Sequence, residues 1–347
     1  MKTGRTIAEL VKEIERQNEV KLDYKADTRQ LRLNDVTAGT MEINGFGNFG
    51  IRNRTHRQIG TRLAIPAKYY DRLLRDHPDM LANNVNSLFH REPEKRMIRT
   101  LDGNARAFLS DRYLPLDNYD LAEAALPTLG DKNMKIQSCE ITEDHLYLKA
   151  TLPSLQAEVR VGDVVEAGIS IANSEVGASS FRIHPLILRL TCMNGAVAQA
   201  EGLKRYHVGA NGSGNGETAH EFYRDDTRKA LDDAFWRQVR DTIDHVLTKE
   251  VFERVVDTMR EGTAKKIGGD PVKAVEEVQK KFQYTDDERG GILKHLIMGG
   301  DLSAYGLSQA ITREAQDAES YDRASQLEYD GFKVLELPKT EWAVIAS

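Results

Sequence analysis

Apolar residues recur at intervals of three and four in several parts of the chain, which is the spacing of a helix with one buried face. This pattern predicts an opening helix over residues 6–18 and a second helix that begins at Pro66 and stops near His77-Pro78. Proline suits the first turn of a helix, because its fixed φ is helical and its missing N–H needs no partner there. Residues 21–34 alternate in part and predict a short strand or hairpin, whereas residues 41–62 show little periodicity.

Alternation of apolar and polar residues dominates the middle of the chain. Asp102-Gly103-Asn104 separates two alternating segments, and Asp-Gly is typical of a tight hairpin turn, so we expect a hairpin over residues 96–113. A short helix is expected after it, at residues 120–129. Further strands are then expected at residues 135–141, 145–152, 157–161, 164–173 and 181–192. Several strands flanked by helices predict an α+β fold with an antiparallel or mixed sheet.

Helical spacing returns in the last third of the chain. A glycine-rich segment precedes it and favours a loop or linker. The expected helices lie within residues 219–262, from Asp270-Pro271 onward, at 288–298 and at 303–321, with a strand or docked tail at 332–337. The predicted organisation is an α+β core domain (residues 1–206), the glycine-rich linker (residues 207–218) and a mainly helical C-terminal region (residues 219–347).

The composition is that of a folded protein without a membrane-spanning segment. The chain has 347 residues, of which 40% are hydrophobic and 29% charged. No apolar run approaches the ~18 residues that span a bilayer, so we expect a soluble, cytoplasmic protein. The net charge of −6 excludes a histone-like basic coat but leaves room for a local basic surface. Two cysteines are too few for a disulfide framework or a four-thiolate zinc site.

Residues Gly45-Phe46-Gly47-Asn48-Phe49-Gly50 form a G-x-G-x-x-G string. Dinucleotide binding needs a buried strand before such a string and an apolar helix after it, and the flanking residues are too polar for either. A glycine-rich turn that two phenylalanines anchor to the core is the plainer interpretation. A third interpretation rests on the charge of the segment.

The segment from Gly45 to Arg62 contains four arginines and no acidic residue. Arginine forks bind phosphate oxygens and aromatic rings stack on unpaired bases, so the segment suits single-stranded nucleic acid. The candidate contacts are Arg52, Arg54, Arg57 and Arg62, with Phe46 and Phe49.

A second basic region lies further along the chain, at Arg182, Arg189, Lys204 and Arg205. Arg182 and Arg189 are seven residues apart and therefore on opposite faces of a regular strand, so ordinary salt bridges are the alternative to a shared patch. Acidic residues offset a third set, for which structural pairing is expected: Arg96, Arg99, Arg106 and Arg112.

Motifs for catalysis are missing from the sequence. It contains no H-E-x-x-H or G-x-S-x-G, and the glycines of residues 209–216 lack the G-K-[ST] ending of a phosphate loop. Cys192 reads as a buried small hydrophobe at a strand end, and Asn194-Gly195 as a turn. We expect no cofactor, although a two-carboxylate magnesium site assembled from distant residues stays open.

One block of the sequence is similar to a known family. The matching residues are Asp163, Gly168, Asn173-Ser174-Glu175, Gly177, Arg189, Cys192 and Asn194-Gly195, and residues 63–70 and 105–113 are similar to the same family. The block resembles the phage- and plasmid-borne family catalogued as domain of unknown function 932. The resemblance implies a place on mobile elements, beside genes that handle DNA. Asn173-Ser174-Glu175 reads either as a turn that satisfies backbone groups or as a ligand-facing corner.

These observations favour a DNA-recombination accessory that binds single-stranded DNA and anneals complementary strands without ATP. Acidic outer faces beside basic inner ones also favour a homo-oligomer. The alternatives are a regulatory or protein-interaction factor of a mobile element and a metal-dependent nuclease.

Overall fold

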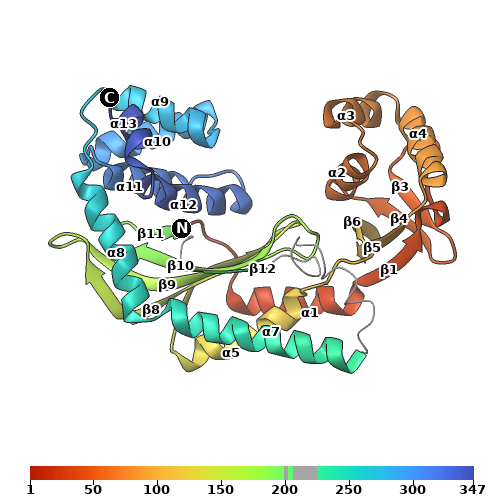
Figure 1. Ribbon diagram of the computed structural model, residues 1–347, viewed down its shortest axis with the longest axis horizontal. Coiled ribbons are helices and arrows are strands. Elements are labelled where there is room, and N and C mark those ends of the chain that lie inside the picture. Colours follow the sequence, from red (N-terminus) through yellow and green to blue (C-terminus); the bar gives the residue numbers. More distant parts are fainter. Residues whose placement is uncertain (199–201, 206–224) are drawn as a thin grey trace.

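Two β-sheets organise the chain in the computed structural model, which describes residues 1–198, 202–205 and 225–347 (Figure 1). The first sheet has the strand order β1-β5-β6-β4-β3-β2 and is mixed, because β4 and β6 run parallel. Its strands are β1 (Leu22–Asp27), β2 (Leu31–Leu33), β3 (Thr40–Ile43), β4 (Gly47–Ile51), β5 (Lys95–Leu101) and β6 (Asn104–Ser110). Its core is shared with α2 (Asn53–Arg62), α3 (Ala67–Asp76) and α4 (Pro78–Arg91).

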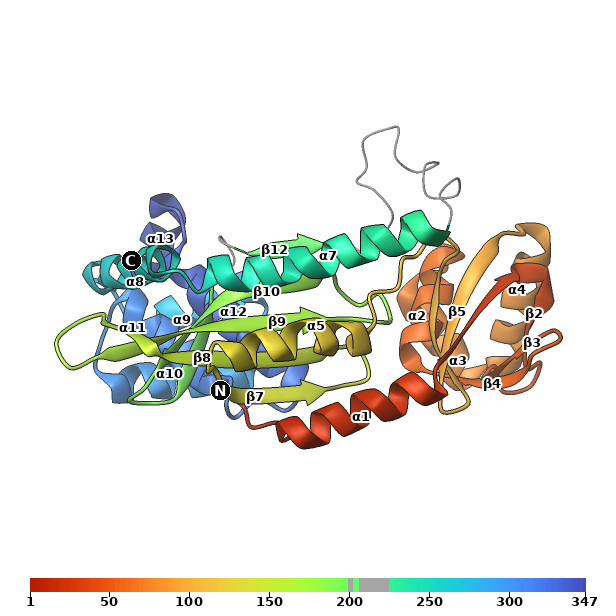
Figure 2. The same cartoon turned by 90° about the horizontal axis from the view of Figure 1, so that it is seen from below.

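The second sheet is antiparallel, in the order β11-β10-β9-β8-β7, with β12 paired beside β10. Its strands are β7 (Lys135–Ile141), β8 (Leu146–Glu158), β9 (Val164–Asn173), β10 (Phe181–Arg189), β11 (Asn194–Val197) and β12 (Leu203–Arg205). One face carries α1 (Ile7–Val20), α5 (Asn118–Asp131) and α7 (Asp225–Val246), and Figure 2 shows α5 and α7 lying lengthwise along it.

The C-terminal helices cover part of the opposite face of the second sheet. They are α8 (Lys249–Ala264), α9 (Pro271–Phe282), α10 (Asp286–Gly299), α11 (Ala304–Glu314), α12 (Tyr321–Leu335) and α13 (Lys339–Ala346). In Figure 1 these helices and the α2–α4 unit stand apart at the two ends of the sheet, on the same side of it.

The helical spacing in the sequence explains how α7 packs. Phe235, Val239 and Ile243 recur every four residues, so they share one helix face, and all three are buried against the second sheet. Phe181 of β10 meets Phe235 edge to face, with 5.4 Å between ring centroids. At about 25 cal/mol per Å² of apolar surface, each such side chain contributes roughly 2 kcal/mol to folding.

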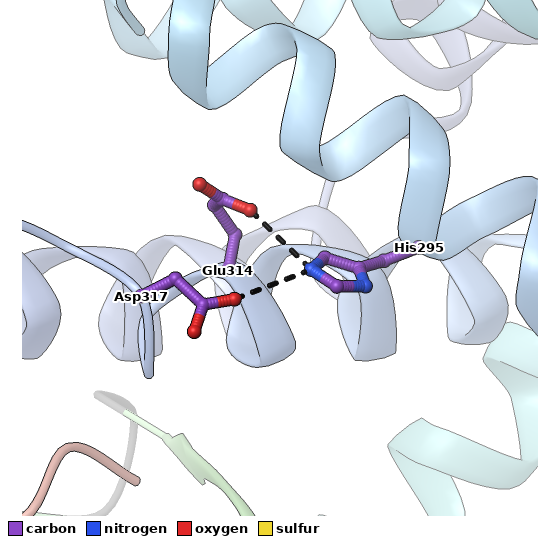
Figure 3. Close-up of side chains that lie close together, drawn as sticks. All are labelled: His295, Glu314 and Asp317. Carbon is purple, nitrogen blue, oxygen red and sulfur yellow. Dashed lines mark ion pairs between the residues drawn. The ribbon is translucent and has the colours of Figure 1, made fainter.

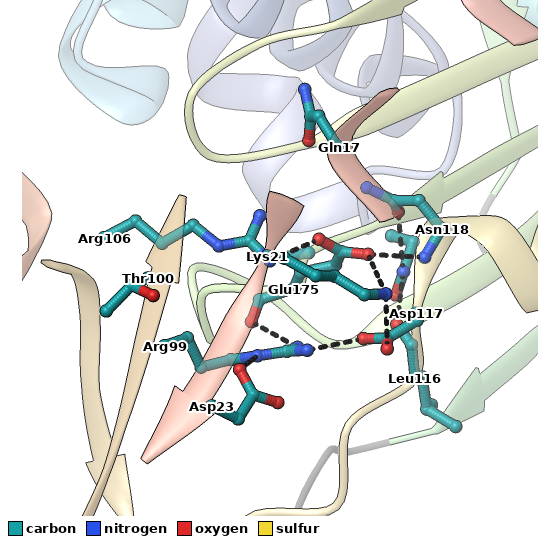
Figure 4. Close-up of polar contacts among 12 residues, drawn as sticks. Gln17, Lys21, Asp23, Arg99, Thr100, Arg106, Leu116, Asp117, Asn118 and Glu175 are labelled. Carbon is teal, nitrogen blue, oxygen red and sulfur yellow. Dashed lines mark hydrogen bonds and ion pairs between the residues drawn. The ribbon is translucent and has the colours of Figure 1, made fainter. Parts of the chain in front are cut away.

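A buried network of charges connects the two sheets (Figure 4). The Arg99 side chain is fully buried, and its guanidinium donates to Asp23 (2.9 Å), to Asp117 (2.7 Å) and to the backbone carbonyl of Glu175 (3.0 Å). Arg106 pairs with the Glu175 carboxylate at 2.7 Å. The expected structural pairing of Arg99 and Arg106 is confirmed, and through Glu175 it ties β5 and β6 to the end of β9.

The α+β fold with a helical C-terminal region is confirmed. The Asp102-Gly103 hairpin is present between β5 and β6, and both turn residues have positive φ (50° and 71°), as a tight two-residue turn requires. Strands β7 and β9 have the predicted bounds. The glycine-rich linker at 207–218 lies outside the described residues.

The strand alternative for residues 21–34 is confirmed by β1 and β2, whereas the hairpin alternative is wrong, because β1 pairs with β5 and β2 with β3. The helix expected after Pro66 ends at Asp76, as predicted, and Pro78 starts a separate helix, α4, that was not predicted. Two other local predictions are wrong. Residues 157–161 are not a separate strand, because β8 continues to Glu158 across a register shift. Residues 332–337 form no strand, because residues 332–335 are the last turn of α12, and their alternating pattern reflects burial on both sides.

Candidate functional site

The fold supplies carboxylates to the arginine-rich segment, which contains none of its own. Arg54 pairs with Asp144 through two hydrogen bonds, and Arg52 lies 3.7 Å from Glu143, both acids coming from the turn between β7 and β8. Arg62 forms a two-pronged pair with Glu94. Of the four candidate arginines, Arg57 is exposed and has no ion pair with any described residue. The expectation of an arginine strip free of acids is therefore wrong.

The same segment forms α2, which the polar sequence did not suggest. Its buried face has one large apolar residue, Ile59, and is otherwise small or polar, with Thr55, His56 and Gly60. A Cβ on Gly60 would lie 2.8 Å from the Tyr70 ring, so the glycine is what lets α3 approach. The His56 Nδ1 lies 3.0 Å from the Tyr70 hydroxyl, and burial lowers the pKa of His56 to about 4.

The G-x-G-x-x-G string is a hairpin between β3 and β4. Gly45 and Gly47 have φ of 85° and 118°, which only glycine adopts without strain. Phe46 and Phe49 pack on Tyr24, with centroids 4.8 and 5.4 Å away. The interpretation as a glycine-rich turn is confirmed, but only Phe49 packs against the core, whereas Phe46 covers Tyr24 from outside and is 57% exposed.

Two residues of the second basic region lie together. Arg182 of β10 is directly opposite Lys204 of β12, so both point to one face of the sheet. The Arg182 guanidinium lies 5.4 Å from the centre of the Tyr329 ring in α12, and its buried Nε has no hydrogen-bond partner. Among the described residues, no carboxylate forms an ion pair with Arg182.

The other two residues of that region lie elsewhere. Arg189 is at the far end of β10, where its Nε binds Asp163 at 2.5 Å. Arg205 is opposite Phe181 in the register, and its side chain lies outside the described part of the structure. The shared patch of four basic residues is thus reduced to Arg182 and Lys204.

The two basic regions approach each other across the second sheet. Gln58 of α2 donates to the Val176 carbonyl (2.8 Å), in the loop that leads into β10. Near Arg54, His145 and Tyr147 both hydrogen-bond to Asp322 at 2.8 Å. We call Arg57, Arg182 and Lys204 the basic seam, and leave out Arg54 because Asp144 pairs with it. Burial, followed by the charges of Arg182 and Lys204, lowers the pKa of His184 to about 4.

A cavity of about 350 Å³ lies between the β10–β11 corner and helices α10 and α11. Arg189, Cys192 and Asn194 line it from the sheet, and Tyr305 reaches Asp163 with its hydroxyl (3.0 Å). Cys192 is exposed there rather than buried, and its sulfur lies 3.6 Å from Arg189 Nη1. The prediction of a turn at Asn194-Gly195 is wrong, because both residues belong to β11 and the turn precedes them. Residues that carried the family resemblance therefore meet at one cavity.

A cluster of potential metal ligands shares one residue with this cavity (Figure 3). His295 Nε2 lies 3.4 Å from a Glu314 carboxylate oxygen and 3.7 Å from one of Asp317. Burial and the nearby acids Asp317 and Glu288 raise the pKa of Glu314 to about 7. Sequence reasoning missed these residues because the histidine and the carboxylates come from different helices. The spacing of Glu314 and Asp317 (i, i+3) was the one local indication.

The turn interpretation of Asn173-Ser174-Glu175 is confirmed. The Asn173 amide donates to the Leu116 carbonyl (2.7 Å), and Ser174 Oγ accepts from the Ala178 N–H (2.9 Å). Glu175 accepts from the Asn118 N–H at 2.7 Å. These side chains satisfy backbone groups and hold the loop that carries Val176 toward α2.

Comparison with models of protein families, with curated proteins and with solved structures finds no match. The similarity to domain of unknown function 932 therefore stays a prediction. No helix in the described ranges combines the length and the apolarity needed to cross a bilayer.

Proposed function

We propose that this protein binds single-stranded DNA along the basic seam, as an accessory of mobile-element recombination. The observation that carries the proposal is the placement of Arg182 directly opposite Lys204, on the sheet face toward α12. Like charges in opposite cross-strand positions repel each other. A phosphate group between them turns that repulsion into attraction on both sides.

The surroundings of Arg182 also favour a nucleic-acid backbone as the ligand. Its guanidinium rests on the Tyr329 ring, which fixes its direction, and has no carboxylate partner among the described residues. Arg57 of α2 adds an exposed cation that forms no ion pair with any described residue. Four arginines are excluded from the proposed contacts, because carboxylates already pair with them: Arg52, Arg54, Arg62 and Arg189.

Binding of this kind suits strand annealing. Contacts to phosphates hold a strand without using its base edges, which stay free to pair with a complementary strand. Such a reaction needs neither ATP nor a catalytic group. Single strands rather than duplex are expected, since Arg54 and Arg62 of α2 are already paired with Asp144 and Glu94, so that this helix offers few free cations to a major groove.

The first prediction concerns the salt dependence of DNA binding. In the double variant Arg182→Gln/Lys204→Gln we expect weaker binding of a fluorescent 30-nucleotide single strand and a flatter plot of log K against log [salt]. Each lost phosphate contact on a single strand flattens the slope by ~0.7, so the double variant should lose about 1.4. Fluorescence anisotropy between 50 and 300 mM salt measures both quantities.

The control removes the same charge elsewhere. Lys12 and Lys339 are exposed on α1 and α13, and Lys12→Gln/Lys339→Gln should leave the slope unchanged. Equal slopes in all three proteins would refute the seam as the binding surface. Shortening of the oligonucleotide on addition of Mg²⁺ would favour the nuclease alternative, and failure to bind any DNA at 150 mM salt would favour a protein partner.

A further inference from the structure

The arrangement of His295, Glu314 and Asp317 has the geometry of a metal-ion site. Two atoms that each lie about 2.1 Å from one tetrahedral ion are about 3.4 Å from each other. The histidine nitrogen lies 3.4 and 3.7 Å from the two carboxylates, and the potential ligand atoms all lie within 4.8 Å of one another. We propose that these three residues bind one divalent transition-metal cation, of the Zn²⁺ or Mn²⁺ class, in the wall of the cavity.

The fold makes room for this arrangement at Gly291, one turn before His295 on α10. A Cβ at residue 291 would lie 1.9 Å from a Glu314 carboxylate oxygen. The glycine therefore allows the Glu314 carboxylate to lie against α10 beside the imidazole. Figure 3 shows both carboxylates converging on the same ring nitrogen from the end of α11.

The local charge balance favours a bound cation. Two carboxylates, those of Glu314 and Asp317, lie together. Besides His295, the described residue that pairs with Asp317 is Arg313, at 3.3 Å. Glu314 has His295 as its ion-pair partner in the described chain. One nitrogen and two carboxylate oxygens suit Zn²⁺ or Mn²⁺ better than Ca²⁺, which prefers six to eight oxygens.

The neighbouring cavity supplies an independent indication of a ligand. His295 lines it, and so does Gln309, which is 9% exposed and whose Oε1 has no hydrogen-bond partner in the described structure. Three protein ligands leave an open coordination position, as in catalytic rather than structural metal sites. Water or a small anion from the cavity, held near Arg313, completes the coordination.

The experiment measures binding of Mn²⁺ alone to the full chain by electron paramagnetic resonance, and the change in thermal midpoint on addition of Zn²⁺, Mn²⁺ or Mg²⁺. We expect one Mn²⁺ per chain and a higher midpoint with Zn²⁺ and Mn²⁺ than with Mg²⁺. Glu314→Gln and His295→Gln should each weaken Mn²⁺ binding at least tenfold. The control Glu277→Gln changes a half-buried carboxylate on α9, far along the chain from the three ligands, and should bind Mn²⁺ as the parent does.

Circular dichroism without metal shows whether each variant is folded. Gly291→Ala provides a second probe, because it moves the Glu314 carboxylate and leaves all three ligands in the sequence; it should also weaken Mn²⁺ binding. Equal Mn²⁺ affinity in the parent and both ligand variants would overturn the proposal, and so would the absence of binding at 1 mM Mn²⁺ or equal stabilisation by Mg²⁺. The proposal does not depend on DNA binding.

Discussion

Lys149 shows how far a single residue can depart from its local pattern. It sits in the alternating segment of β8 but is 1% exposed, and it pairs with the fully buried Glu328 of α12 at 2.5 Å. Its ammonium also reaches Ser325 Oγ (3.1 Å) and lies 4.7 Å from the centre of the Tyr321 ring. The charge is tolerated in the core because each of these groups faces it.

This pair yields a prediction about stability. Glu328→Gln leaves the Lys149 charge buried without a counter-charge, so we expect a loss of about 3–5 kcal/mol in the free energy of unfolding. In Lys149→Met/Glu328→Gln no charge remains, and the loss should be smaller than in Glu328→Gln alone. Urea unfolding of the two variants and the parent measures the difference. A double variant less stable than the single one would contradict this account.

His56 yields a prediction about pH. Its pKa is about 4 in the folded protein and 6.5 when unfolded, so the unfolded chain binds more protons between these values. Stability therefore rises with pH from 4 to 6.5 and is lost as pH falls, by about 3 kcal/mol for this residue. His56→Asn, which can still hydrogen-bond Tyr70, should show a correspondingly shallower dependence. Unfolding free energies that depend on pH equally in both proteins would refute the assignment.

At the scale of elements, local patterns were predicted well and long-range pairing was not. The Asp102-Gly103 hairpin is encoded by adjacent residues, so its turn and both strands could be found. The partner of β1 lies some seventy positions away, at β5, and no local pattern indicates it. Helix α2 was missed because its buried face depends on Gly60 and Tyr70 fitting together, rather than on several apolar residues.

The candidate sites follow the same rule. The basic residues were visible in the sequence, but the carboxylates that neutralise Arg54 and Arg62 come from other elements, at Asp144 and Glu94. Whether an arginine is available to a ligand therefore depends on the fold. The face shared by Arg182 and Lys204 depends on how β12 pairs with β10.

Gly177 yields a prediction about the loop between β9 and β10. It has φ of 69°, and a Cβ there would lie 2.8 Å from Leu109 Cδ2. Gly162 has φ of 80° but open space around it. Gly177→Ala and Gly162→Ala should share the cost of the strained backbone, and Gly177→Ala should lose an additional 1–3 kcal/mol or so through overpacking. Chemical unfolding compares them, and equal losses would show that Leu109 yields without cost.

On the scale of the whole molecule, the buried network around Arg99 holds the α2–α4 unit against the second sheet (Figure 4). Lys21 extends it by pairing with Asp117 at 2.6 Å. The network joins α1, β1, β5 and α5 to the Glu175 turn. Because ion pairs in dry surroundings are screened little by salt, this connection should persist at the salt concentrations used to weaken DNA binding.

The order of the elements along the chain also affects how the protein is made. Val165, Ala167 and Ile187 of the second sheet pack in one core with residues of α8 to α13, which are synthesised after the strands. Until a ribosome has translated those helices, this side of the sheet lacks the side chains that cover it. The nascent chain therefore exposes an apolar sheet face before α8 to α13 emerge, and that is the stage at which a chaperone can protect it from aggregation.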